Sequence, residues 1–185
     1  MVVLIILGVI ILMLVFMYNS LISKKNQVEN IFASVDTQLK KRYDLIPNLI
    51  ASVQEYMKHE RGTLNTITEL RAQALKPNLN NEQKIALDAK ITSALGSIMV
   101  AVEDYPELKA NQNIMHLQNT LHEVEAQIAA ARRAYNQTVT DYNNAIEMIP
   151  TNIMANFMHY TRKAVFEISE SERAHVNVKE LFKHE

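Results

Sequence analysis

The six histidines are the side chains of this sequence with the widest chemical range, because imidazole can ligate metals and transfer protons near neutral pH. They lie at positions 59, 116, 122, 159, 175 and 184. A di-iron helical bundle needs two Glu-x-x-His pairs on facing helices, and the sequence offers one, Glu172 with His175. His59 and His122 each precede a glutamate, but adjacent side chains on a helix point in different directions. The histidines therefore predict no metal site and no cofactor.

Nucleophile and phosphate-binding motifs are also missing. The sequence has no cysteine, which excludes thiolate chemistry and disulfides. Its three glycines, Gly8, Gly62 and Gly96, are too far apart for a phosphate-binding loop or a Gly-x-Ser-x-Gly turn. We therefore predict no catalytic residue, no enzymatic activity and no polar pocket.

Two further sets of polar residues, a basic run and a pair of asparagines, are better explained by packing or solvation than by catalysis. The basic run 40–42 could bind lipid head groups, but on a continuous helix it lies about 33 Å beyond Tyr18. That is several times the Debye length of about 8 Å, so a solvated or inter-helix charged face is the favoured interpretation. Asn136 and Asn143 are seven residues apart and share a helix face. Polar residues at heptad spacing often fix the register of helix packing.

The elements that position these residues are predicted to be helices alone. The chain has 185 residues with 3 Gly and 4 Pro, whereas average usage gives roughly 13 Gly and about 9 Pro. A sheet needs turns that these residues form, so the composition predicts an all-α fold. A net charge of −1 argues against a nucleic-acid partner.

The first 18 residues contain no charged side chain. With Leu21 and Ile22, they give about 22 residues and about 33 Å of helix, enough to cross a bilayer. A cleavable signal peptide is the alternative, but no basic residue precedes the segment and no small-x-small site follows it. Lys24 and Lys25 lie just after the segment. They predict a single-pass anchor with the N-terminus outside and the remaining chain in the cytoplasm.

Apolar residues after the anchor recur at alternating spacings of three and four. One such seam, from 110 to 149, predicts a helix with Asp104 as N-cap, Pro106 in its first turn and Pro150 at its end. A second seam, from 28 to 74, predicts a helix continuous with the anchor and kinked, not broken, near Pro47.

Two shorter helices complete the predicted bundle. Asn80 or Asn81 caps a helix that runs to Glu103, and Thr151 caps another that runs to His159. The division is then 1–22 as transmembrane anchor, 23–161 as a bundle of three to four helices, and 162–185 as an irregular C-terminal tail. A short strand-like alternation lies at 175–178.

The predicted helices differ in length. The helix that follows Pro106 measures about 65 Å, and the one that ends at Glu103 about 35 Å. Longer helices would overhang the shorter one and leave an apolar seam exposed. We expect the short last helix, the tail or another copy of the chain to cover it, and self-association is the hypothesis that follows.

Four segments together resemble the LemA family. They are QLKKRYDLIPNLI at 38–50, HERGTLNTITELRAQA at 59–74, ALGSIMVAVEDYPELKANQN at 94–113 and AARRAYNQTVTDYNNAIEMIP at 130–150. The similarity covers almost the whole chain in order. It is loosest at 157–167, where His159 and Tyr160 stand in place of the family's usual Gly-Phe.

The resemblance implies a single-pass protein of the bacterial inner membrane with an all-α, elongated and mostly antiparallel helical bundle. It supplies no catalytic residues, and its motif residues are expected to be structural. They are Arg42, Tyr43, Asp44, Pro47, Asn48, His59, Glu60, Tyr105, Pro106, Asn111, Arg133, Tyr135 and Asn136. The family's loose link to envelope stress and membrane-protein quality control supplies a context without a mechanism.

The leading hypothesis is a membrane-anchored helical scaffold that self-associates or docks a membrane-protein partner. One alternative is a metal-binding or enzymatic bundle whose His, Glu and Arg residues meet across helices. Another is a lipid-binding protein that shapes the membrane through amphipathic helix faces.

Overall fold

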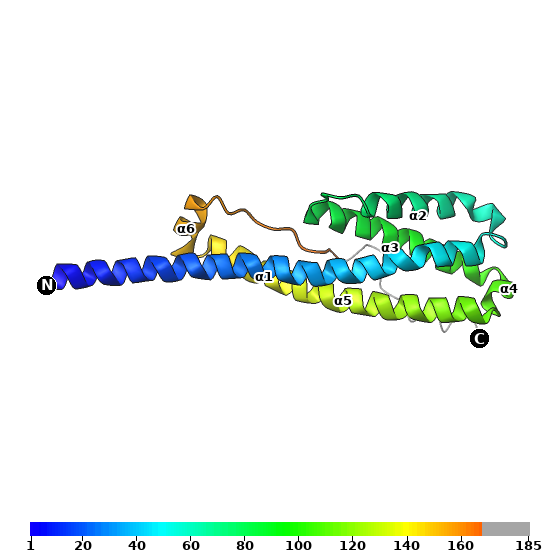
Figure 1. Ribbon diagram of the computed structural model, residues 1–185, viewed down its shortest axis with the longest axis horizontal. Coiled ribbons are helices and arrows are strands. Elements are labelled where there is room, and N and C mark those ends of the chain that lie inside the picture. Colours follow the sequence, from blue (N-terminus) through cyan, green and yellow to red (C-terminus); the bar gives the residue numbers. More distant parts are fainter. Residues whose placement is uncertain (168–185) are drawn as a thin grey trace, which may run out of the picture.

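The longest element of the protein is α1, a helix of 52 residues from Val2 to Val53 (Figure 1). The computed structural model describes residues 1–167, in which every regular element is a helix. No side chain before Leu21 is buried, although residues 2–20 are almost all apolar. These residues form about 29 Å of helix, close to the thickness of about 30 Å of a hydrocarbon core. This part of α1 fits a membrane anchor.

The single helix predicted up to residue 74 is divided in two in the structure, so that prediction was wrong. After α1 the chain reverses through the short 3₁₀ helix η1 (Lys58–Glu60), and α2 (Arg61–Ala74) runs back antiparallel to α1. The predicted seam has polar residues at Glu60 and Thr63, which gain little from burial in a continued helix. Met57 is fully buried and packs the inside of the reversal.

Pro47 lies inside α1 without breaking it, as the sequence predicts. Proline has no amide proton, so the carbonyl of Tyr43, four residues earlier, lacks its usual helical donor. Arg71 of α2 supplies a replacement, because its Nε donates to the Tyr43 carbonyl oxygen at 2.7 Å. The missing hydrogen bond of α1 thus becomes a connection between α1 and α2.

The helix α3 (Asn81–Glu103) begins and ends where the sequence predicts. Asn80 is its N-cap, and its side chain accepts a hydrogen bond from the amide of Gln83 at 2.8 Å. The Gln83 side chain accepts in return from the Asn80 amide at 3.0 Å. This reciprocal pair is a capping box, which satisfies two amides that a helix start otherwise leaves free.

The long helix predicted after Asp104 is interrupted near its start. A single turn, α4 (Pro106–Lys109), is followed by α5 (Gln112–Glu147). The prediction that Asp104 caps this helix was wrong, since α4 has no side-chain cap. Asn111 caps α5 instead, and its side chain accepts from a backbone amide at 2.9 Å. A short amide side chain that binds nearby backbone favours such a restart.

The end of α5 and the start of α6 (Thr151–Phe157) also differ from the prediction. α5 stops before Pro150, which is itself the N-cap of α6. The Thr151 hydroxyl does not cap α6; it donates to the carbonyls of Ala145 at 2.6 Å and Met148 at 2.9 Å. Thr151 therefore ties the new helix back to the old one.

α6 ends at Phe157, two residues earlier than predicted. His159 has a φ of 53°, in the left-handed region that favours glycine. The amide of Tyr160 donates to the carbonyl of Ala155 at 3.0 Å, which is the pattern of a Schellman helix end. The backbone therefore explains why glycine is usual at position 159 in the family that the sequence resembles.

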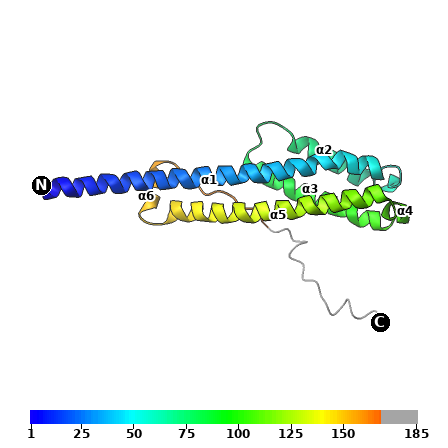
Figure 2. The same ribbon diagram turned by 60° about the horizontal axis from the view of Figure 1, so that its bottom comes forward.

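The helices form an elongated antiparallel bundle (Figures 1 and 2). α5 runs back along α1, while α2 packs against α3, and α4 lies at the end farthest from the N-terminus. After α6 the chain runs along the bundle without regular structure to residue 167. The strand-like pattern at 175–178 and the pair Glu172 and His175 lie outside the described residues.

The apolar seam of α5, for which the sequence predicted a cover, is covered within the chain, mainly by α1. Its buried members, such as Leu121, Ile128 and Tyr142, belong to the same core as α1 residues such as Val28 and Leu39. α5 is longer than α3, but its apolar seam is not left exposed, because α1 extends beside it.

Candidate functional site

The most unusual side chain of the bundle is Arg42 of α1, which is fully buried. It belongs to the basic run 40–42, for which the sequence favoured a solvated or inter-helix charged face. Lys40 and Lys41 are exposed, but Arg42 points into the core among helices α1, α3 and α5. A buried guanidinium needs both charge compensation and hydrogen-bond acceptors.

Three residues, Asp88, Glu125 and Thr92, accept hydrogen bonds from the terminal nitrogens of Arg42, and two of them supply negative charge. Asp88 of α3 is itself 1% exposed, and one of its carboxylate oxygens accepts from Arg42 Nη2. Its other oxygen accepts from Nη2 of Arg132 on α5. Arg42 Nη1 donates to Glu125 Oε1 at 2.9 Å and to Thr92 Oγ1 at 3.0 Å. We call Arg42, Asp88, Glu125 and Arg132 the ionic cluster.

Burial and the charges of the ionic cluster together shift the pKa values of Arg42 and of its neighbour Tyr43. Burial lowers the pKa of Arg42, but the Asp88 and Glu125 carboxylates outweigh this effect and leave that pKa raised. Burial also raises the pKa of the Tyr43 phenol to about 12, and the negative charge of Asp88 acts in the same direction. Two guanidinium groups and two carboxylates balance in charge. Because both Asp88 oxygens are engaged, the geometry is that of a cross-link among three helices.

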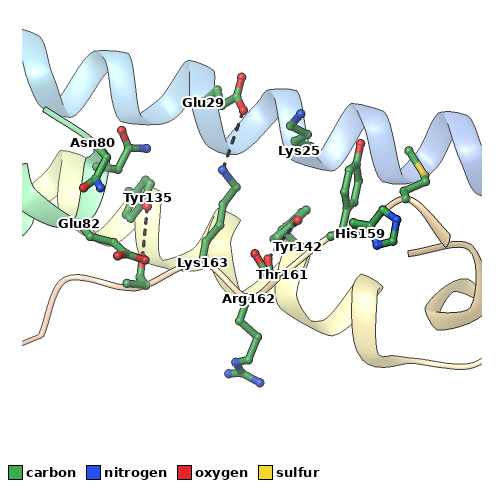
Figure 3. A pocket seen from close by; sticks show the side chains of 14 residues that line it. Lys25, Glu29, Asn80, Glu82, Tyr135, Tyr142, His159, Thr161, Arg162 and Lys163 are labelled. Atoms are coloured by element: carbon green, nitrogen blue, oxygen red, sulfur yellow. Dashed lines mark hydrogen bonds and ion pairs between the residues drawn. The ribbon is translucent and has the colours of Figure 1, made fainter. Parts of the chain in front are cut away.

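A second polar arrangement lies on α5, where a Tyr-Asn pair occurs twice at heptad spacing; Figure 3 shows its two tyrosines, Tyr135 and Tyr142. Asn136 accepts from the amide of Phe166 at 2.8 Å and donates to its carbonyl at 2.8 Å. Asn143 does the same with Lys163, at 2.9 and 3.0 Å. The hydroxyls of Tyr135 and Tyr142 donate to further carbonyls of the same segment, each at 3.2 Å. We call these four α5 residues the Tyr–Asn clamp.

Helix and extended backbone match in spacing at the Tyr–Asn clamp. Seven residues of helix rise about 10.5 Å, and three residues of extended chain span about 10 Å. The clamp therefore holds two residues of the extended segment that are three apart. The sequence suggested that Asn136 and Asn143 fix the register between helices; the structure shows that they bind the backbone of 163–166 instead.

A polar cavity of about 690 Å³ adjoins the clamp, although the sequence predicted no polar pocket. Lys25 and Glu29 of α1 line it together with the chain that follows α6 (Figure 3). Lys163 lies 3.9 Å from Glu29 across the cavity. The described residues contain no group of three His, Asp or Glu that could hold a metal ion.

An apolar groove lies between α3 and α5 beside the ionic cluster. It consists of two adjoining cavities of about 1000 and about 340 Å³, which share Thr92 and Gly96. Asp88 and Arg132 lie in its wall, and Phe166 lies at the point where the extended segment enters it. We call this feature the α3–α5 groove.

Apart from Pro47 inside α1, the motif residues of the sequence fall into three groups. Arg42, Tyr43, Tyr135 and Asn136 belong to the ionic cluster, the clamp or their direct surroundings. A second set lies at the turns of the bundle end farthest from the N-terminus: His59, Glu60, Tyr105, Pro106 and Asn111. Asp44, Asn48 and Arg133 are exposed, so the sequence motif combines core and surface positions.

Sequence reasoning missed Asp88, Glu125 and Arg132. A signal for Asp88 was present, because it lies three residues before Ile91 and so continues the apolar face of α3. A charge at a core position of one helix should be sought together with an opposite charge at a core position of another, here Arg42.

Comparison with known proteins gives a consistent assignment. The model of the LemA family matches residues 31–179. A protein LemA of Metamycoplasma hominis is 28% identical over 163 residues, which is 88% of this chain and 74% of that relative.

Shorter matches occur to magnetosome proteins. Magnetosome protein MamQ 2 of Paramagnetospirillum magneticum is 31% identical over 83 residues, or 45% of this chain and 30% of the relative. Magnetosome protein MamQ of Magnetospirillum gryphiswaldense is 29% identical over 82 residues, which is 44% of this chain and 30% of the relative. These alignments cover a part of each relative.

Proposed function

Since this chain belongs to the LemA family, we propose that it acts as a non-enzymatic scaffold anchored in the membrane. It holds a binding surface at a set distance from the bilayer and assembles with further copies of itself. A membrane-protein partner, in the family's context of envelope stress and membrane-protein quality control, is a further part of this proposal.

The observation that carries the proposal is the continuity of α1. A single helix from Val2 to Val53 contains both the apolar anchor and one side of the bundle core. A flexible linker would let a domain rotate freely, whereas a continuous helix holds the anchor and the bundle in one orientation. Such a construction suits a protein that presents a surface to partners in the same membrane.

The proposal places the protein in the bacterial inner membrane with a single span. Lys24 and Lys25 support an N-terminus outside the cell and a bundle in the cytoplasm, since basic residues favour the cytoplasmic side. We keep residues 1–22 as the anchor, 23–161 as the bundle and 162–185 as the tail.

The surface that supports self-association lies on α3, because the seam of α5 is already covered within the chain. An exposed row with spacings of three and four runs along α3 and lines the α3–α5 groove: Ala86, Ala89, Ser93, Gly96 and Val100. Small residues at this spacing let another helix approach closely. α3 is also long and apolar enough to span a membrane, with 33% of its most apolar stretch buried in the bundle. Its outer face is thus unusually apolar for a helix exposed to water.

A shared membrane restricts how two copies can meet. Both anchors must enter the same bilayer in the same direction, so the two-fold axis of a dimer lies along the membrane normal. The two α3 helices then run parallel, and Gly96 of one copy faces Gly96 of the other. This arrangement can be tested by cross-linking.

The test compares Gly96→Cys with Gly62→Cys in the full chain, which has no other cysteine. Both glycines lie in helices, and an added Cβ meets no atom within 4 Å at either position. Mild oxidation of cell membranes should give disulfide dimers for Gly96→Cys and leave Gly62→Cys monomeric. Equal yields for the two variants would contradict packing through α3.

Mass measurement in mild detergent provides a second test of self-association. The unmodified chain should be larger than a monomer, and Gly96→Leu should reduce it to a monomer because the longer side chain blocks close helix approach. A monomeric unmodified chain at a concentration like that in the membrane would overturn the assembly.

The non-enzymatic part of the proposal is supported by the ionic cluster, whose carboxylates bind guanidinium groups of the same chain. Elemental measurement of the purified protein tests the metal-dependent alternative. A stoichiometric, tightly bound metal would contradict the scaffold interpretation.

A further inference from the structure

The short helix α6 lies across the bundle end from which the anchor leaves (Figure 1). It and the turn before it expose four large apolar side chains: Met148 at 63%, Ile149 at 82%, Ile153 at 70% and Phe157 at 82%. Apart from the anchor itself, no other stretch of the described chain concentrates so many. Contiguous apolar surface of this kind marks an interaction site.

The two sides of α6 have different surroundings. Ala155 is buried and Met154 and Met158 pack against the core, so this side faces the bundle. Ile153 and Phe157 are four residues apart, hence neighbours on one helix face, and both are exposed. A surface helix usually turns polar side chains outward, whereas α6 is apolar on both sides.

The height of α6 coincides with the expected membrane surface. Residues 2–20 supply about 29 Å of helix, which fills a hydrocarbon core of about 30 Å. Leu21, the next residue, is the first buried side chain of α1. α6 packs on α1 at this end of the bundle, and Lys25 lies 5.5 Å from the ring of Tyr160, just beyond α6.

The chemistry around α6 suits a lipid interface. Lys24 and Lys25 are partly exposed beside it, where they can meet anionic head groups. A short helix with aromatic and aliphatic side chains outward, flanked by basic residues, is typical of helices that lie in the interface plane.

We propose that Met148, Ile149, Ile153 and Phe157 form an interfacial lipid-binding surface, which enters the same bilayer that α1 crosses. The protein then has two membrane contacts, one that spans the bilayer and one that lies in its surface. Two contacts fix the rotation of the bundle about α1 as well as its tilt. This inference does not depend on self-association.

The test uses depth-dependent quenching with the full-length protein. Because the chain has no cysteine, Phe157→Cys and Ile153→Cys can each carry one environment-sensitive fluorophore. Tyr56→Cys is the control, since Tyr56 is an aromatic residue 42% exposed at the opposite end of the bundle. Each variant is reconstituted into phosphatidylcholine vesicles that contain phosphatidylglycerol, and far-UV circular dichroism checks the helical fold.

Labels at 157 and 153 should show blue-shifted emission and lose intensity when lipids carry a nitroxide on the upper acyl chain. The label at 56 should respond to aqueous iodide instead. Iodide quenching at 157 and 153 equal to that at 56 would overturn the proposal. Protection from both quenchers would also overturn it, because a protein surface would then cover α6; nanodiscs with one copy each would show whether that surface belongs to a second copy.

Discussion

At the residue scale, the ionic cluster is the main departure from an apolar core. Taking charges out of water costs several kcal/mol per ion, and good geometry with hydrogen bonds is needed to offset that cost. Arg42 and Asp88 have that geometry and bring α1, α3 and α5 together at one point. The cluster therefore specifies which helices meet and in which register.

Replacing Asp88 should reveal the strength of this cross-link. Asp88→Asn keeps the size of the side chain but leaves the buried Arg42 with Glu125 as its one anionic partner. We expect the free energy of unfolding to fall by about 3–5 kcal/mol, the usual cost of breaking a buried ion pair. Denaturant unfolding in detergent, followed by circular dichroism, measures the change.

Asp44→Asn is the matched control for Asp88→Asn. Asp44 pairs with Lys40 at 2.8 Å on the same helix, but both side chains are more than half exposed. Its loss should cost no more than about 1 kcal/mol, as for other surface ion pairs. Similar losses for the two variants would show that burial adds nothing to the cluster.

The sequence predicted the ionic cluster only in part. Arg42 could be recognised as unusual because it occupies an apolar seam position, but its partners lie 46 and 83 residues away in sequence. Spacing along one helix predicts which face is buried, not which residue of another helix faces it. Asp88 and Glu125 therefore needed the tertiary structure.

At the element scale, Pro47 and Arg71 act as a pair. The proline frees the Tyr43 carbonyl and the arginine binds it at 2.7 Å, so the effect of each depends on the other. A proline that looks misplaced within a helix thus supports the packing of the neighbouring helix.

A double-mutant cycle tests this dependence. Arg71→Gln should cost about 1–3 kcal/mol when Pro47 is present, because the carbonyl loses its donor. In a Pro47→Ala background the alanine amide can bind that carbonyl, so the same change should cost less. Denaturant midpoints of the four proteins give the coupling energy. Equal costs in both backgrounds would mean that Arg71 contributes independently of Pro47.

The elements themselves were predicted unevenly. α3 was placed correctly at both ends because Asn80 and Gln83 form a local capping box that the sequence displays. The reversal after α1 was missed because no glycine or proline marks it; polar residues at two seam positions were its signal. Thr151 was predicted to cap α6, but its hydroxyl binds two carbonyls at the end of α5. The local sequence does not distinguish between these two roles.

At the scale of the whole molecule, anchor and bundle share one helix and α5 runs back beside it (Figure 2). The all-α fold followed from composition and periodicity, and its antiparallel arrangement was what the resemblance to the family implied. The pairing of α1 with α5 did not, because an apolar seam shows that a helix needs a partner without showing which one.

The proposed orientation has a direct test in intact cells. Lys58→Cys lies in η1, at the bundle end farthest from the anchor. With a cytoplasmic bundle, a membrane-impermeant maleimide should label residue 58 only after permeabilisation. Labelling of residue 58 in intact cells would place the bundle outside the cell.

The Tyr–Asn clamp has a consequence for how this part of the chain can diverge among relatives. It binds amides and carbonyls of Lys163 and Phe166, which every residue except proline provides. The two asparagines therefore place no demand on the side chains that they bind, and in this segment it is the buried ring of Phe166 that is held by the core. A stretch that diverges quickly in sequence can still keep its place in the structure, as the loose resemblance at 157–167 illustrates.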